Sequence, residues 1–177
     1  MHIFLQGPKR IGKSTVISRT LEIVLARSEL RLGGFFTWNG GKDDPNVYMK
    51  PACHSRSGEI YRLASWNDVS KRLVCDVSVF ERDGVRLLGD SPDADLLILD
   101  ELGFLESDAT VFKQSVMEII TGDIPVFGVL RLGDVPWHAE IKRNPLVTLY
   151  DVNEKNRDKL PQELAERLAP QGLGSSV

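Results

Sequence analysis

The chain has 177 residues, of which 42% are hydrophobic and 27% charged, and its formal net charge is −3. This length suggests one domain that buries a core without disulfides or a structural metal, and the composition argues against a disordered or fibrous chain. A domain that coats nucleic acid is normally basic, so we expect no nucleic-acid partner. Two Cys and three His are too few for a disulfide framework or a His-rich metal site.

The sequence also shows no sign of export or of a membrane. No apolar run approaches the roughly 20 residues of a membrane span, and the N-terminal residues lack the basic start and long apolar core of a signal peptide. We therefore expect a cytoplasmic protein in which Cys53 and Cys75 are reduced thiols.

The chain opens with a predicted strand, loop and helix. Residues 1–5 are apolar and β-prone, and apolar residues then recur at helical spacing from Val16 to about Arg27. The loop between them matches the pattern G-x-x-x-x-G-K-[ST] and reads Gly7, Pro8, Lys9, Arg10, Ile11, Gly12, Lys13, Ser14 and Thr15.

This pattern is typical of a phosphate-binding P-loop. Glycines let the backbone approach phosphate oxygens, which the loop N–H groups and the following helix N-terminus bind. We expect all of residues 7–15 to bind nucleotide phosphates, with Lys13 reaching the β and γ oxygens in catalysis and Ser14 ligating Mg²⁺. Lys9 and Arg10 add two cations, which either neutralise a triphosphate or form a solvated rim.

The middle of the chain reads as β structure followed by a helix. Gly33–Trp38 forms a predicted strand, residues 39–46 are dense in turn formers, and Val47–Ala52 and Glu59–Leu63 look like the arms of a hairpin. This small β-hairpin insert breaks the alternation of strand and helix, so we place it at an edge of the sheet. Val77–Leu88 has the apolar positions of a helix.

Alternation then resumes to the end of the chain. The predicted strands are Leu96–Leu99, Pro125–Leu130 and Leu146–Tyr150, and the predicted helices are Ala109–Thr121, Pro136–Arg143 and Leu160–Leu168. Strands that alternate with helices indicate an α/β fold with a mostly parallel central sheet covered on both faces. We expect a single domain over residues 1–170 and a loose tail over 171–177.

The strand Leu96–Leu99 leads into Asp100 and Glu101, the pattern of a Walker-B strand. Ligands of such sheets bind at the carboxyl ends of the strands, which is where the P-loop also lies. Asp100 is expected to hold Mg²⁺, and Glu101 to orient and deprotonate an attacking water.

Four further residues are candidates for the same edge. Arg131 follows a strand and either stabilises transition-state charge as a catalytic residue or pairs with Asp134. Asn156 and Arg157, together with Asn153, either contact the base or ribose of the nucleotide or form the entry to the last helix.

The aromatic residues of the predicted strand Gly33–Trp38 have two possible roles. Phe35, Phe36 and Trp38 either stack on a base or belong to the core, and the core is favoured because the strand needs apolar residues. Trp137 and His138 are expected to make contacts at the start of a helix rather than to act in catalysis.

With these motifs in place, the chain resembles the small P-loop nucleoside-triphosphatases of bacteria and archaea, a family that includes a cancer-related human enzyme. The resemblance runs nearly end to end and rests on the P-loop at residue 7, Gly34–Thr37, Asp100–Glu106, Ala139–Arg143 and Asn156–Asp158. It implies a three-layer, RecA-like core and Mg²⁺-dependent hydrolysis of nucleoside triphosphates, ATP and GTP among them, to diphosphate and phosphate.

Two positions depart from the family pattern. The family usually has a third glycine where this chain has Arg10, and a lysine where it has Phe104. We hypothesise that Arg10 supplies the cation that is missing at position 104.

Two other functions share the P-loop. A nucleotide or small-metabolite kinase usually carries an acceptor domain and an Arg-rich lid, whereas Arg131, Arg143 and Arg157 stand singly here. A nucleotide-dependent switch would show very slow turnover that a partner protein stimulates. We favour hydrolysis, because little of the chain is left for an acceptor domain and a lid. Separately, we expect a monomer.

Overall fold

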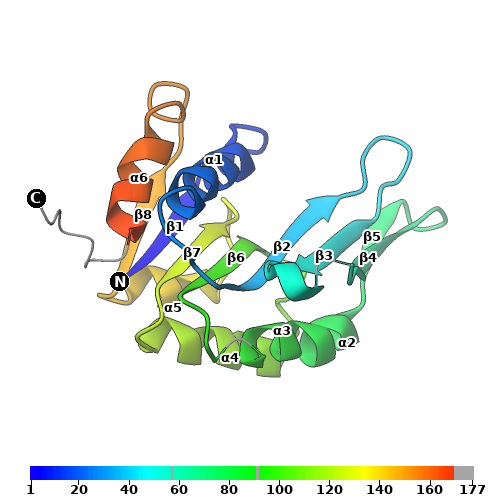
Figure 1. The fold of residues 1–177 in the computed structure, drawn as a ribbon. Helices are drawn as coiled ribbons and strands as arrows, with labels where there is room; N and C mark the ends of the chain where they lie inside the picture. Colours follow the sequence, from blue (N-terminus) through cyan, green and yellow to red (C-terminus); the bar gives the residue numbers. More distant parts are fainter. Residues whose placement is uncertain (57, 91, 170–177) are drawn as a thin grey trace, which may run out of the picture.

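The computed structural model describes residues 1–56, 58–90 and 92–169. An eight-stranded sheet with the order β5-β4-β3-β2-β6-β7-β1-β8 lies between two layers of helices (Figure 1). In chain order the elements are β1 (His2–Gln6), α1 (Lys13–Leu25), β2 (Leu32–Asn39), β3 (Val47–Pro51), η1 (His54–Arg56), β4 (Tyr61–Asn67), β5 (Arg72–Cys75), α2 (Val77–Val79), η2 (Phe80–Gly84), α3 (Val85–Gly89), β6 (Leu96–Leu102), α4 (Thr110–Thr121), β7 (Val126–Leu130), α5 (His138–Arg143), β8 (Val147–Asp151) and α6 (Leu160–Leu168).

The parallel part of the sheet consists of β2, β6, β7, β1 and β8. Strand β7 lies between β1, which leads into the P-loop, and β6, which carries the acidic pair. This is the RecA-like order, and it confirms the predicted three-layer α/β fold. The carboxyl ends of β1, β6 and β7 therefore meet at one edge of the sheet.

The predicted hairpin insert is an antiparallel extension of the main sheet. Strand β3 pairs with β2 and with β4, so the insert lies at the sheet edge as expected. It also holds β5, a strand that the sequence did not predict, paired with β4 from Ala64↔Cys75 to Asn67↔Arg72. The predicted helix over 77–88 is present as α2, the π-helical turn η2 and α3.

Two apolar cores lie on the two faces of the sheet. Helices α1 and α6 cover one face and α2 to α5 the other (Figure 1). Successive side chains of a strand point to opposite faces. Leu96 and Ile98 of β6 therefore enter the core beneath α1 and α6, whereas Leu97 and Leu99 enter the core on the side of α2 to α5. Buried apolar side chains on both faces explain why β6 reads as a continuous apolar run.

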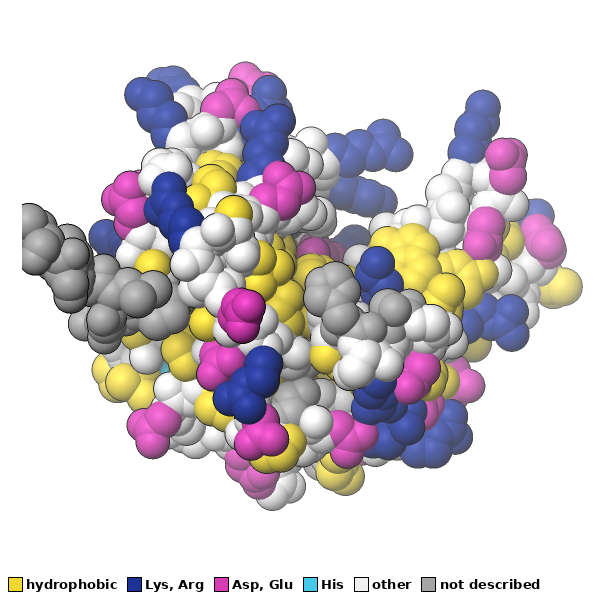
Figure 2. Space-filling view, viewed as in Figure 1, with side chains coloured by type: hydrophobic (Ala, Val, Ile, Leu, Met, Phe, Trp, Pro, Cys, Tyr) yellow, Lys and Arg dark blue, Asp and Glu magenta, His cyan; other side chains and the backbone are white. Residues whose placement is uncertain are grey.

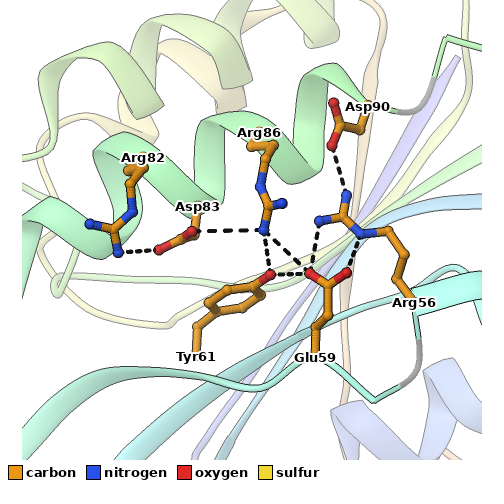
Figure 3. Close-up of polar contacts among 7 residues, drawn as sticks. All are labelled: Arg56, Glu59, Tyr61, Arg82, Asp83, Arg86 and Asp90. Atoms are coloured by element: carbon orange, nitrogen blue, oxygen red, sulfur yellow. Dashed lines mark hydrogen bonds and ion pairs between the residues drawn. The ribbon is translucent and has the colours of Figure 1, made fainter.

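A polar network ties the antiparallel edge to α3 (Figure 3). At its centre the Glu59 carboxylate accepts hydrogen bonds from Arg56 at 2.7 and 2.8 Å, from Arg86 at 3.3 Å and from the Tyr61 hydroxyl. Arg56, followed by Tyr61, lowers the pKa of Glu59 to about 2. Arg56 also donates to Asp90 at 2.7 Å. The network fixes the β3–β4 loop against the helices beneath it.

Within the described residues, no helix is long and apolar enough to cross a membrane. Both cysteines are free thiols, as expected. Burial raises the pKa of Cys75 to about 11, and its Sγ donates to the carbonyl of Leu105 at 3.1 Å. The predicted tail, 171–177, lies outside the described residues.

His138, at the start of α5, is 1% exposed, and neither ring nitrogen has a hydrogen-bond partner among the described residues. Its ring meets that of Trp137 edge-on at 4.8 Å, in agreement with the predicted contacts at a helix start. Burial, followed by the charge of Lys142, lowers the pKa of His138 to about 4.

This histidine predicts a loss of stability in mild acid. Between pH 6.5 and 4 the unfolded chain binds a proton at this position and the folded chain does not, so the free energy of unfolding falls as the pH drops, by up to about 3 kcal/mol. Urea unfolding of wild type and His138→Leu should show the stability difference between them changing by about this amount between pH 7.5 and 4. The other titrating groups are shared and cancel, so parallel stability curves would contradict the assignment.

Candidate functional site

The loop after β1 has a backbone that only certain residues tolerate. Gly7 has φ 154°, and a Cβ there would lie 2.6 Å from the carbonyl oxygen of Val152. Gly12 has φ 109° and directly precedes the first residue of α1. The two glycines of the sequence pattern therefore stand where a side chain would clash or strain the backbone, and the N-terminus of α1 opens on the loop.

Lys13 begins α1 and is only 9% exposed. Its Nζ donates to the carbonyl oxygens of Gly7 at 2.9 Å and Pro8 at 3.0 Å, so the ammonium group sits in the concave side of the loop. Burial lowers the pKa of Lys13, while the nearby carboxylates of Glu101 and Asp100 oppose that shift. The buried Lys13 ammonium group is therefore close enough to the acidic pair of β6 for their opposite charges to attract.

Arg10 adopts a left-handed backbone conformation with φ 65° and an exposed side chain. This explains why a glycine fits the position, because only glycine adopts such angles without strain. We expect Arg10→Gly to raise the free energy of unfolding by up to about 1 kcal/mol in urea titrations.

The same variant tests the hypothesis that Arg10 supplies a cation to the nucleotide, in which case ATP affinity or turnover falls. Lys71, with φ 50° in the turn between β4 and β5, is the matched control. Lys71→Gly should relieve similar strain without changing ATP binding. Unchanged ATP affinity and turnover in Arg10→Gly would refute the compensation.

Strand β6 is longer than predicted and runs through the acidic pair to Leu102. Asp100 is 5% exposed, and burial, followed by the charge of Glu101, raises its pKa to about 7. The backbone N–H of Glu101 donates to Thr37 Oγ1 at 3.0 Å. The neighbouring strand β2 therefore fixes the peptide from which the Glu101 side chain projects.

Arg131 follows β7 at the same edge. Its Nη1 lies 3.5 Å from Glu101 Oε1, and its guanidinium carbon lies 4.6 Å from the centre of the Phe104 ring. Among the described residues the ion-pair partner of Arg131 is Glu101, and the alternative pairing with Asp134 is not formed. Arg131 and Phe104 are half-exposed, and both line the same cavity as the acidic pair.

This cavity of about 410 Å³ brings most of the predicted chemistry together. Its lining includes Lys9, Ser14, Asp100, Glu101 and Arg131. Figure 2 shows the hollow between the P-loop side and the β2–β3 hairpin, with Lys and Arg side chains reaching into it. A larger cavity of about 660 Å³, lined by Leu25, Arg31 and Cys53 among others, lies elsewhere and contains none of the predicted site residues.

The turn that leads into α6 contacts the P-loop through Arg157. Asn156 donates to the carbonyl of Asp151 at 2.8 Å and accepts from the N–H of Asn153 at 2.8 Å, so both asparagines shape this turn. Arg157 donates to the carbonyl of Ile11 at 3.4 Å. Of the three candidates here, Arg157 is the one whose side chain touches the P-loop.

The predicted aromatic candidates divide between the two faces of β2. Phe35 is fully buried, with its ring 5.9 Å from that of Phe112. Phe36 and Trp38 point to the opposite face, where Trp38 stacks on Tyr48 at 5.5 Å. Phe35 is therefore a core residue, while Trp38 also lines the 410 Å³ cavity.

Comparison with known proteins agrees with this geometry. The model of the family described as NTPase matches residues 2–165. The chain belongs to the NTPase family. Membership confirms the predicted family and, at the level of the family, the prediction of a nucleoside-triphosphatase enzyme.

Relatives of this NTPase-family chain match it along almost their whole length. It is 26% identical to nucleoside-triphosphatase THEP1 of Methanosarcina barkeri, covering 94% of this chain and 97% of the relative. It is 29% identical to THEP1 of Thermotoga maritima, with 93% of each chain covered.

Two solved structures share the fold. The crystal structure of THEP1 from Aquifex aeolicus matches with a TM-score of 0.77 at 23% identity, over 95% of this chain and 99% of the other. The solution structure of a human cancer-related nucleoside triphosphatase matches with a TM-score of 0.75 at 23% identity, over 98% and 99%. At this identity the likeness supports the fold alone.

The cavity also contains residues that the sequence did not single out. Glu106 is 2% exposed, lines the same cavity and accepts a hydrogen bond from the N–H of Gly103. Burial raises its pKa to about 7. The sequence did contain one signal for Glu106, because it is a third carboxylate that closely follows Asp100 and Glu101. Thr37 gave no signal, because its contact to Glu101 depends on the pairing of β2 with β6.

The oxygen donor atoms in this cavity suit a hard cation. Ser14 supplies a hydroxyl oxygen and Asp100 a carboxylate oxygen, and both line the cavity. Mg²⁺ prefers oxygen ligands and is usually held by one or two protein groups together with water and phosphate oxygens. The residues present therefore fit the ion that the sequence predicts.

Proposed function

We propose that this chain hydrolyses nucleoside 5′-triphosphates, ATP and GTP among them, to the diphosphate and phosphate in a Mg²⁺-dependent reaction. The observation that carries the proposal is the meeting of Ser14, Asp100, Glu101 and Arg131 in one cavity beside the P-loop. In the proposed reaction water is the acceptor, and the oxygen bridging the β- and γ-phosphates leaves with the diphosphate.

Phosphate binding is assigned to the loop. Backbone N–H groups of residues 7–15 and the N-terminus of α1 hold the phosphate oxygens, and Lys13 neutralises charge on the β and γ oxygens. Asn156 and Arg157 are proposed to contact the nucleotide from the α6 side, and the donation from Arg157 to Ile11 supports this for Arg157.

Ser14 and Asp100 would hold Mg²⁺. Bound there, the ion supplies positive charge that stabilises the phosphate oxygens. The raised pKa of Asp100, about 7, reflects a buried carboxylate whose charge the fold alone only partly offsets. A nearby cation would favour the ionised form of this carboxylate.

Glu101 is proposed as the general base. Its carboxylate accepts the proton of the water whose oxygen attacks the γ-phosphorus, and the bond to the bridging oxygen breaks as the new bond forms. The hydrogen bond from its backbone N–H to Thr37 supports the role, because it fixes the starting point of the side chain. Arg131, directly after the adjacent strand β7, is proposed to stabilise the charge that develops on the transferring group.

The test is phosphate release from ATP and GTP without an acceptor, compared with transfer across a panel of nucleoside monophosphates and small hydroxyl compounds. We expect phosphate release that depends on Mg²⁺ and is not increased by any acceptor. Transfer to an acceptor with little free phosphate would instead favour a kinase. Release that appears only with a co-purifying protein would favour a switch protein. The cytoplasmic location and the monomeric state remain predictions.

A further inference from the structure

The Arg131 side chain is held at three points. Its guanidinium group pairs with Glu101 at 3.5 Å and lies over the Phe104 ring at 4.6 Å. Its stem passes close to Gly103, where a Cβ would lie 3.3 Å from Arg131 Cδ. Its backbone N–H donates to the carbonyl of Leu102 at 2.8 Å. The end of β6 and the two residues that follow it therefore determine where this arginine points.

That segment is itself fixed from both sides. The Gly103 N–H donates to the buried Glu106 carboxylate, and the Gly103 carbonyl accepts from Trp137 Nε1 at 3.1 Å. Phe104 follows directly, yet it is 47% exposed and contributes nothing to either buried core. The Phe104 ring instead lines the 410 Å³ cavity, where the Arg131 guanidinium lies over its face.

We propose that Phe104 is a positioning residue that holds the Arg131 guanidinium beside Glu101, facing the region of the γ-phosphate. An aromatic face attracts a cation, and a planar guanidinium group stacks well on it. A free arginine side chain loses considerable rotamer freedom when it is fixed in one place. The Phe104 ring removes part of this cost before the reaction, so that the arginine meets the developing charge already oriented. This role rests on the proposed hydrolysis.

The first test separates ring chemistry from bulk. Phe104→Leu keeps an apolar side chain without the aromatic face, and Phe104→Tyr keeps the ring. A cation–π contact at an exposed site predicts that kcat falls about 2- to 5-fold in Phe104→Leu, with an unchanged KM for ATP and a kcat close to wild type in Phe104→Tyr. Val111→Ala, at an apolar position with similar exposure on α4, is the control and should leave kcat unchanged.

The second test asks whether the effect passes through Arg131. In an Arg131→Ala background, Phe104→Leu should have no further effect on kcat, because coupled residues deviate from additivity. An equal loss of kcat in both backgrounds would overturn the proposal. A Phe104→Leu enzyme with wild-type kcat, or a Phe104→Tyr enzyme as slow as Phe104→Leu, would do the same.

A readout without catalysis separates this role from the proposed function. The NMR resonance of the Arg131 Nε–H group is assigned by its loss in Arg131→Lys. Because the face of the Phe104 ring shields nearby protons, this resonance should lie upfield in wild type relative to its position in Phe104→Leu. If wild type releases no phosphate, the proposed hydrolysis fails and the catalytic role fails with it, while the resonance still reports the contact. If wild type hydrolyses ATP and the resonance does not respond to Phe104→Leu, the positioning role alone is wrong.

Discussion

Phosphate release should fall at least about 100-fold when Lys13 is replaced by alanine, the range seen when a preorganised donor is removed from a transition state. The Lys13 ammonium group lies in the hollow of the loop, 2.9 Å from the carbonyl of Gly7, and is almost fully buried. A water molecule that entered the space left by the side chain would not replace its positive charge. The measurement is the initial rate of phosphate release at saturating ATP and Mg²⁺.

Lys42→Ala is the matched control, because Lys42 is an exposed lysine in the turn between β2 and β3. It should leave the rate unchanged and so show that loss of a positive charge alone is not the cause. A Lys13→Ala enzyme within a few-fold of wild type would contradict the assignment of the P-loop.

Replacing Glu101 by glutamine should lower kcat by about 10²- to 10⁴-fold, the contribution of a positioned general base. Glutamine has nearly the same shape and leaves the backbone hydrogen bond to Thr37 in place, but it does not accept a proton. Nucleotide binding should persist, since the loop and Lys13 are unchanged. Single-turnover hydrolysis and equilibrium ATP binding, measured on the same preparation, give the two quantities.

Glu118→Gln, on the exposed face of α4, is the control for this variant. It should hydrolyse ATP at the wild-type rate. A Glu101→Gln enzyme that turns over normally would exclude Glu101 as the base. One that loses ATP affinity in proportion to its rate would show that the residue binds nucleotide rather than water.

Local patterns predicted the parts of the fold that depend on local chemistry. The loop glycines, the helical spacing after Lys13 and the apolar run of β6 each carry their signal within a few neighbouring residues. Strand β5 escaped prediction because its four residues, Arg72–Cys75, are stabilised by pairing with β4 rather than by their own sequence.

The residues around Arg131 were less predictable. The sequence suggested that Arg131 lies at the ligand edge but left its partner open, since that partner depends on β7 lying beside β6. The structure shows Glu101 in that place. It also shows a cation, Arg131, next to Phe104, the position where the family usually has a lysine. We therefore propose Arg131 as a second source of the charge that Arg10 was expected to supply.

In the proposed reaction, water attacks the γ-phosphate in the cavity of Asp100, Glu101 and Arg131. Hydrolysis of ATP in ¹⁸O-labelled water, with both products examined by mass spectrometry, tests it most directly. We expect one ¹⁸O atom from water in each phosphate released and none in the diphosphate. Label in the diphosphate, or release of phosphate only when an acceptor is supplied, would contradict it.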